Sequence, residues 1–149
     1  MEAILRTDAS NNDFIELVAA LDDELAERDG DDHSFYDQFN KIEDIKYAVI
    51  FYHNKTPVAC GAIKEHNEDA MEVKRMYTLP AFRGKGLASK TLFELENWAR
   101  ELGYTKCILE TGKRQPEAIA LYHKNNYVRT ANYGQYIGVD NSVCFERIL

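Results

Sequence analysis

The sequence predicts one α/β domain, in which a mixed, mostly antiparallel, twisted sheet is flanked by helices. Three strand-like runs follow one another between residues 45 and 78 with only short polar turns between them, which is typical of an antiparallel meander. From residue 86 onward, helical and strand-like runs alternate, so a strand there can run parallel to its neighbour across a helical crossover. The chain has 149 residues and no repeat or linker, so the predicted domain spans residues 1–149.

The N-terminal part predicts a strand followed by a helix. Residues 3–7 form the strand candidate, and Asn12 or Asp13 can cap a helix that runs through Leu25 with apolar residues at helical spacing. The polar run 29–32, which contains Gly30, is expected to end this helix. A second short helix is predicted over residues 34–41.

The three runs of the meander cover residues 45–52, 57–64 and 71–78. Residues 53–56 have the composition of a hairpin turn, and residues 65–69 form a second polar turn. Strict alternation along the third run places Glu72 and Met76 on one face. It places Val73 and Tyr77 on the other face.

The C-terminal half begins with an amphipathic helix over residues 86–102, which Gly103 ends. A strand is predicted over 106–110 and a helix over 116–124, with a proline in its first turn. Two last strands are expected at 127–130 and 142–148.

Composition and charge exclude several classes of function. The net charge of −7 disfavours a nucleic-acid partner, which needs clustered Lys and Arg. No apolar run approaches the roughly 18–20 residues that span a membrane, and the N-terminus lacks a signal-peptide pattern, so we expect a cytoplasmic location. Cys60, Cys107 and Cys144 lie in apolar runs without metal-ligand spacing, which predicts buried thiols and no metal site.

A glycine-rich loop precedes the helix at residue 86. The first turn of a helix has unpaired N–H groups and a partial positive charge, and Gly84 and Gly86 allow the backbone to approach a bulky anion. Arg83 and Lys85 add positive charge, so the loop suits a pyrophosphate. It departs from the Walker A loop, the dinucleotide fingerprint and the kinase glycine loop in residue spacing or in the flanking elements.

The segment 76–88 (MYTLPAFRGKGLA) resembles the acetyl-coenzyme A motif of the GNAT superfamily of N-acetyltransferases. A second block resembles the strand, helix and strand that follow in that family: it comprises LETG at 109–112, QPEAIALY at 115–122 and NYV at 126–128. Together the blocks cover about half of the chain, and the order of elements fits the rest. The resemblance implies a GNAT-like fold and acetyl-CoA as the acyl donor, with no metal.

The resemblance also implies which residues hold the donor. The pyrophosphate is expected on the backbone amides of the glycine loop, and Ser89 begins the helix beyond it. The main chain of the preceding strand is expected to bind the pantetheine arm. Gln115 stands where the family often has Asn. The donor-binding residues implied are Met76, Tyr77, Thr78, Arg83, Gly84, Lys85, Gly86, Leu87, Ala88, Ser89 and Gln115.

Acetyl transfer to an amine needs a base for the amine and an acid for the departing thiolate. By resemblance Tyr122 is the general acid, because a phenol is protonated at neutral pH. Glu72 resembles in position the general-base Glu of the histone-acetylating branch. It could equally form a surface pair with Lys74, and many relatives reach the amine only through a water chain.

The acceptor is less constrained by the sequence. Carboxylates crowd the region of residues 22–32, and aromatic residues follow at 35–36 and 133–136, which favours a cationic amine. The carboxylates can equally be a solvated face, and His33 a base or a contact. We therefore expect a small primary amine, such as an amino acid or a polyamine. The alternatives are a protein or peptide N-acetyltransferase, a non-catalytic CoA-binding sensor, and a structural partner protein. No nucleic acid or membrane is expected as a partner, and a homodimer is possible because relatives are often dimers.

Overall fold

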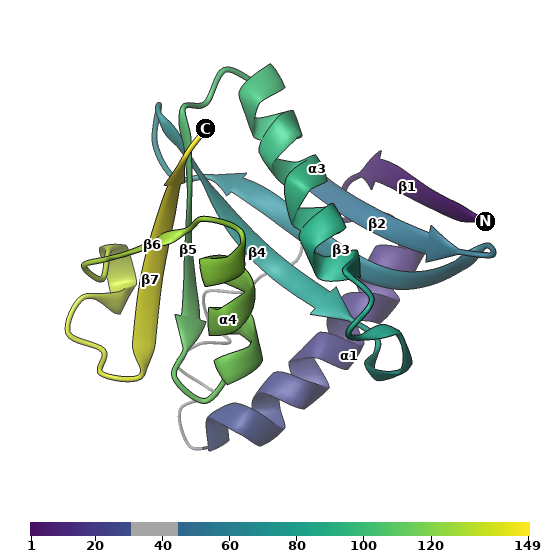
Figure 1. Cartoon of the computed structure of the whole chain (residues 1–149), viewed down its shortest axis with the longest axis horizontal. Helices are drawn as coiled ribbons and strands as arrows, with labels where there is room; N and C mark the ends of the chain where they lie inside the picture. The colour runs from purple at the N-terminus through teal and green to yellow at the C-terminus, as the bar shows by residue number, and fades with distance from the viewer. Residues whose placement is uncertain (31–44) are drawn as a thin grey trace.

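The computed structural model describes residues 1–30 and 45–149. In it seven strands form one sheet in the order β1-β2-β3-β4-β5-β7-β6 (Figure 1). Among these described strands only the β4–β5 pair is parallel, which the helical crossover between them allows, and the other neighbours are antiparallel. The strands are β1 (Glu2–Thr7), β2 (Tyr47–His53), β3 (Thr56–Glu65), β4 (Ala70–Thr78), β5 (Lys106–Gly112), β6 (Val128–Thr130) and β7 (Ser142–Ile148).

Helices cover both faces of the sheet (Figure 1). Helix α1 (Asn12–Asp29) packs on one face through Phe14, Leu17 and Leu21, against strands β2 and β3. Helices α3 (Leu87–Glu101) and α4 (Pro116–Lys124) pack on the other face. Two short 3₁₀ segments are η3 (Pro80–Phe82) and η4 (Gly134–Tyr136). The predicted α/β class with a mixed, mostly antiparallel sheet is confirmed.

The predicted cap of α1 is wrong by one residue. The side chain of Asn11 accepts hydrogen bonds from the backbone N–H of Asp13 at 2.9 Å and of Phe14 at 3.2 Å, so Asn11 is the N-cap and Asn12 already belongs to the helix. Gly30 ends the helix, as expected. The predicted helix over 34–41 and the acidic and aromatic residues between 31 and 36 lie outside the described residues.

A β-bulge in β4 overturns the alternation expected for that strand. Cys60 pairs with Tyr77 but Ala62 pairs with Lys74, so β4 has one residue more than β3 over this stretch. Arg75 takes up the extra length with φ 59°. Beyond it the faces are exchanged: Met76 packs in the α3 layer with Val73, whereas Tyr77 packs in the α1 layer.

Gly61 lies opposite the bulge, beneath α3. A Cβ atom at this position would lie 2.5 Å from Sδ of Met76 and 2.8 Å from Cδ1 of Leu95. Only glycine therefore lets Met76 reach this place. The bulge in β4 thus requires a residue without a side chain at the facing position of β3.

Strands β4 and β5 separate soon after they begin. They pair over three positions, which end at Glu72 and Ile108, and then diverge (Figure 1). Strand β5 continues its pairing with β7 up to Gly112. Beyond the three paired positions, the facing edges of β4 and β5 form no hydrogen-bond ladder with each other, and these edges border the candidate site.

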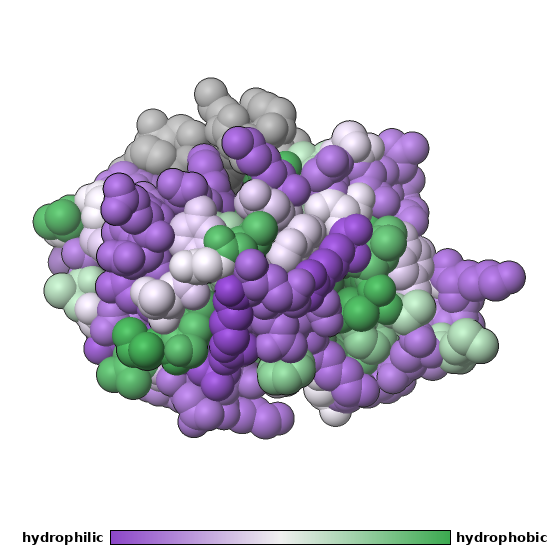
Figure 2. Space-filling model, turned by 90° about the horizontal axis from the view of Figure 1, so that it is seen from above, coloured by the Kyte–Doolittle hydropathy of each residue, from purple (hydrophilic) through white to green (hydrophobic). Residues whose placement is uncertain are grey.

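The face of the molecule shown in Figure 2 is mostly polar, and the thiols are buried. Polar residues predominate on the face shown in Figure 2, and hydrophobic residues lie there in small separate patches. Cys60, Cys107 and Cys144 are all buried and form no disulfide, which confirms the prediction of buried thiols. None of the helices within residues 1–30 and 45–149 is long and apolar enough to cross a membrane.

Candidate active site

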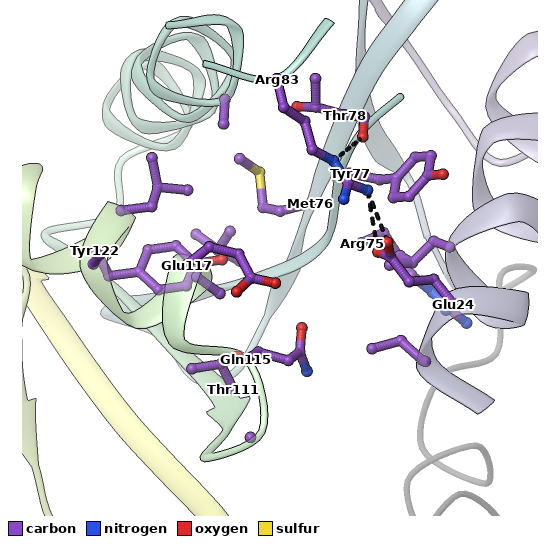
Figure 3. Close-up of a pocket in the computed structure, with 18 of the residues that line it drawn as sticks. Glu24, Arg75, Met76, Tyr77, Thr78, Arg83, Thr111, Gln115, Glu117 and Tyr122 are labelled. Carbon is purple, nitrogen blue, oxygen red and sulfur yellow. Dashed lines mark hydrogen bonds and ion pairs between the residues drawn. The ribbon is translucent and has the colours of Figure 1, made fainter. Parts of the chain in front are cut away.

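A cavity of ≈ 500 Å³ occupies the gap between β4 and β5. The C-terminal half of α1, strand β4 and the glycine loop line one side, and β5 and α4 line the other (Figure 3). Twelve of the thirteen predicted site residues line it: Glu72, Met76, Tyr77, Thr78, Arg83, Gly84, Gly86, Leu87, Ala88, Ser89, Gln115 and Tyr122. The tertiary structure thus brings together both sequence blocks around one cavity.

Lys85 is the exception among the predicted residues. It does not line the cavity, and its ammonium lies 5.2 Å from the centre of the Phe82 ring. Its side chain therefore supplies only long-range charge in this conformation.

The glycine loop has the geometry of an anion site. Gly84 and Gly86 have φ values of 78° and 81°, and a Cβ atom built on either one would meet nothing within 4 Å. Gly86 is the N-cap of α3, whose first turn has no acidic residue and no side-chain cap from the described residues. Its N–H groups are thus left for a ligand, and the space in front of the loop is open.

Arg83 links the loop to both neighbouring elements. Its Nε donates to the carbonyl oxygen of Thr78 at 2.9 Å, and its Nη2 lies 3.0 Å from Oε1 of Glu24 on α1 (Figure 3). The guanidinium also lies 5.6 Å from the centre of the Tyr77 ring. Arg83 is therefore held at the mouth of the cavity with a carboxylate as its partner.

Tyr122 lies on the opposite wall, on α4. Its ring is buried and packs edge-on against Tyr127, with the ring centres 5.7 Å apart, and at 6.1 Å from Phe145. Burial and the nearby carboxyl of Glu110 raise the pKa of Tyr122 above its ordinary value. The hydroxyl therefore stays protonated at neutral pH, as a general acid requires.

Glu72 is engaged by two neighbours at the narrow end of the gap. Its Oε2 accepts a hydrogen bond from the hydroxyl of Tyr133 at 2.6 Å, and its Oε1 lies 3.8 Å from Nζ of Lys74. Burial lowers the pKa of Lys74, and the charge of Glu72 opposes that effect. The pair that the sequence suggested between Glu72 and Lys74 is thus formed, inside the cavity.

Glu110 is a cavity residue that sequence reasoning missed. Burial raises its pKa to about 7, with further contributions from the charges of Glu72 and Asp29, whereas a hydrogen bond from Ser142 and the charge of Lys74 oppose the shift. Its Oε2 is enclosed and has no hydrogen-bond partner among the described residues. A charged residue at the end of the apolar run 107–109 was a signal that could have found it.

Two carboxylates of the acidic stretch of α1 pair with the protein's own arginines. Asp22 lies 2.7 Å from Nη1 of Arg75, and Glu24 pairs with Arg83. In the same helix Arg28 pairs with Glu117 of α4. The first two pairs hold α1 to its own side of the cavity, and the Arg28–Glu117 pair ties it to the opposite side. No group of three His, Cys, Asp or Glu side chains suited to a metal occurs in the described part of the chain.

Comparison with known proteins agrees with this arrangement. The model of the acetyltransferase (GNAT) family matches residues 13–127. An IAA acetyltransferase of Azospirillum brasilense is 37% identical over 94 residues, which are 62% of this chain and 61% of that protein. The chain thus spans less than two thirds of this relative.

Solved structures share the fold along the whole chain. A proposed acyl-CoA N-acyltransferase from Klebsiella pneumoniae subsp. pneumoniae MGH 78578 is 30% identical, with a TM-score of 0.83 over 100% of this chain and 98% of that one. A GNAT family acetyltransferase from Elizabethkingia anophelis, solved with acetyl-CoA bound, is 16% identical with a TM-score of 0.73, over 99% and 98% of the two chains. From the match to the family model and the likeness of fold and sequence to the Klebsiella protein, we conclude that this chain belongs to the GNAT family of acetyltransferases.

Proposed function

We propose that this protein transfers the acetyl group of acetyl-CoA to the nitrogen of a primary amine. The observation that carries the proposal is the open glycine turn at the start of α3, which faces the same cavity as the buried hydroxyl-bearing Tyr122. Family membership and the acetyl-CoA bound to the Elizabethkingia relative support acetyl-CoA as the donor.

In this proposal the backbone N–H groups of residues 83–88 bind the pyrophosphate, and Ser89 adds an N–H from the first turn of α3. The β4 edge at Met76, Tyr77 and Thr78 pairs with the pantetheine arm, because the separation of β4 from β5 leaves that edge without a neighbouring strand. Gln115, whose side chain caps no helix among the described residues, borders the same space.

The chemistry follows from the two walls of the cavity. The amine nitrogen attacks the thioester carbonyl carbon, the C–S bond breaks, and Tyr122 gives its proton to the departing sulfur. The attacking nitrogen loses a proton as the amide forms, and this proton restores the hydroxyl of Tyr122. The sequence suggested Glu72, which lines the cavity, as the base for the incoming ammonium.

A small primary amine is the acceptor that we propose. The carboxylates of Glu72 and Glu110 border the deep part of the cavity, and a cationic ammonium complements them. The described acidic residues of α1 support this less, because Asp22 and Glu24 already pair with arginines. The cytoplasmic location and the homodimer expected from the sequence are part of the same proposal.

Isothermal titration calorimetry with coenzyme A tests the donor site. We expect binding to the wild type and its loss in Gly84→Glu and Gly86→Glu, since either carboxylate would repel the pyrophosphate in a space that is now open. Gly103→Glu, which has a similar φ of 94° far from the loop, is the matched control. No heat with the wild type, or equal binding by the loop variants, would contradict the proposal.

An acetyl-transfer screen over amines, amino acids, polyamines and peptides tests the acceptor. Turnover with small amines supports the proposal, and turnover only with peptides identifies a peptide acetyltransferase. Binding of coenzyme A without transfer to any acceptor identifies a CoA-binding sensor.

A further inference from the structure

We infer that Glu110, and not Glu72, takes the proton from the acceptor ammonium, and that Glu72, held by Tyr133, acts on the reaction through Glu110 as a positioning residue. This inference rests on the proposed function, because it assigns the base of that same reaction.

The two carboxylates occupy different places along the gap. Glu72 is opposite Ile108 at the last paired position of β4 and β5, where the gap is closed by the sheet ladder. Glu110 lies two residues further along β5, which is about 7 Å beyond that point at the rise of a strand. It therefore stands where the strands have already separated, on the same side of the gap as Tyr122.

The hydrogen bonding of the two groups also differs. Both oxygens of Glu72 have close neighbours, a hydroxyl at 2.6 Å and an ammonium at 3.8 Å. Both oxygens are therefore already engaged within the protein. Glu110 accepts a hydrogen bond from Ser142, and its Oε2 has no partner among the described residues. Its carboxylate thus retains the capacity to accept a proton.

The groups that face Glu110 come from every element around it. Strand β4 contributes Glu72 and Lys74, and the end of α1 contributes Asp29. Strand β7 contributes Ser142, and the hydroxyls of Tyr122 and Tyr136 approach from α4 and η4.

Burial and the two neighbouring carboxylates outweigh Ser142 and Lys74, so the pKa of Glu110 lies at about 7. A base with this pKa is substantially deprotonated at neutral pH and still strong enough to accept a proton from an ammonium.

The proton balance is simple. The acceptor enters as R–NH₃⁺, Glu110 takes one proton, and the neutral amine attacks the thioester. Tyr122 supplies the proton of the thiol and regains one from the nitrogen, as proposed above. Glu110 then releases its proton to solvent, so that the reaction yields the amide, the thiol and one proton.

The pH profile of kcat/KM tests this assignment with the whole chain, acetyl-CoA and the best amine of the screen. The wild type should lose activity as the pH falls through about 7, because Glu110 becomes protonated. Glu110→Gln should lower kcat about 100-fold, and its profile should no longer show this fall of activity at low pH, the acid limb. Glu110→Asp should recover part of the rate together with the limb.

Glu72→Gln distinguishes the two carboxylates. It should keep at least about a tenth of the rate, a smaller loss than that expected on removing a general base. Its acid limb should move to lower pH, because one of the negative charges that raise the pKa of Glu110 is gone. Glu68→Gln, which removes an exposed carboxylate in the turn after β3, is the charge-matched control and should leave the profile unchanged.

Two results overturn the inference: loss of the limb in Glu72→Gln with its retention in Glu110→Gln, or full activity of Glu110→Gln. Either can occur in an active acetyltransferase, so it would leave the proposed function intact. A wild type that binds coenzyme A and acetylates no amine contradicts the proposed function, and with it this assignment.

Discussion

At the scale of single residues, burial decides what the titratable groups of the cavity can do. Burial raises the pKa of both Glu110 and Tyr122, and the negative charge of Glu110 further disfavours a second negative charge on Tyr122. The acid therefore stays protonated while the carboxylate titrates near neutrality. Two groups whose pKa values are set apart in one cavity are the arrangement that acid–base catalysis uses.

Replacing Tyr122 by Phe should lower kcat about 100-fold and leave the KM for acetyl-CoA nearly unchanged, since only the proton for the leaving thiolate is lost. The ring remains, so its packing against Tyr127 and Phe145 is kept. Steady-state kinetics measure both constants. Tyr104→Phe removes an exposed hydroxyl bound to Glu65 and should have no such effect. Equal kcat values for wild type and Tyr122→Phe would exclude Tyr122 as the acid.

The pKa of Glu110 predicts a pH-dependent stability. The folded-state pKa of about 7 is higher than the ordinary 4.5, so folding favours the protonated form. The stability from this group is fully present below pH 4.5 and is lost as the pH rises to about 7. The loss amounts to about 3 kcal/mol, taking 1.36 kcal/mol for each pH unit. Urea unfolding of wild type and Glu110→Gln at pH 4.5, 6 and 8 measures it.

As the pH rises from 4.5 to 8, the free energy of unfolding of the wild type should fall relative to that of Glu110→Gln. A difference that stays constant from pH 4.5 to 8 would show that Glu110 titrates normally.

At the scale of elements, the site depends on how β4 leaves its neighbours. The bulge at Arg75 exchanges the faces of the strand, which places Met76 under α3 and Tyr77 over α1. Beyond Glu72, β4 no longer pairs with β5, and its edge becomes available to a ligand. The bulge and the separation therefore convert an ordinary sheet strand into one wall of a cavity.

Gly61→Ala should destabilise the protein by about 1–3 kcal/mol, because the added methyl group overpacks the space against Met76 and Leu95. It should also weaken binding of coenzyme A, since Met76 belongs to the edge that lines the cavity. Thermal unfolding and calorimetry measure the two effects. In a Met76→Ala background the same substitution should cost less, and an equal cost would show that Met76 does not carry the clash.

At the scale of the whole molecule, ion pairs join α1 to parts of the chain more than 50 residues away, on both sides of the cavity. Asp22 pairs with Arg75 of β4, Glu24 with Arg83 of the glycine loop, and Arg28 with Glu117 of α4. These pairs place carboxylates of α1 beside the positive charges of the donor site. In the proposed donor site, the pyrophosphate would therefore compete with Glu24 for Arg83.

Glu24→Gln should tighten binding of coenzyme A by up to about five-fold, because Arg83 is released from a partly exposed ion pair of a typical strength of about 0.2–1 kcal/mol. Calorimetry at low and at physiological salt measures the change, which should be larger at low salt. Glu16→Gln removes an exposed carboxylate elsewhere on α1 and is the matched control. Weaker binding by Glu24→Gln would show that Glu24 supports the donor site instead of competing with it.

The sequence by itself determined the features that depend on neighbouring residues. Hydrophobic periodicity located α1, the meander and α3. The resemblance of the segment 76–88 and of the later block, residues 109–128, indicated the family and most of the cavity wall. Turn, cap and helix-start chemistry act over a few residues, so a sequence pattern is enough to find them. The approach reaches its limit at the start of α1. The cap was predicted at Asn12 or Asp13 but is Asn11, because adjacent Asn and Asp residues are equally suited to this position.

Only the tertiary structure decided where β4 changes face and what surrounds Glu110. The bulge at Arg75 exists because β3 and β4 pair with unequal lengths over a glycine beneath α3, and no periodicity within β4 shows this. The pKa of Glu110 depends on Glu72, Asp29 and Ser142, which lie far from it in the sequence. Burial and charge act through space, so the base of the proposed reaction is set by contacts that form only when the chain has folded.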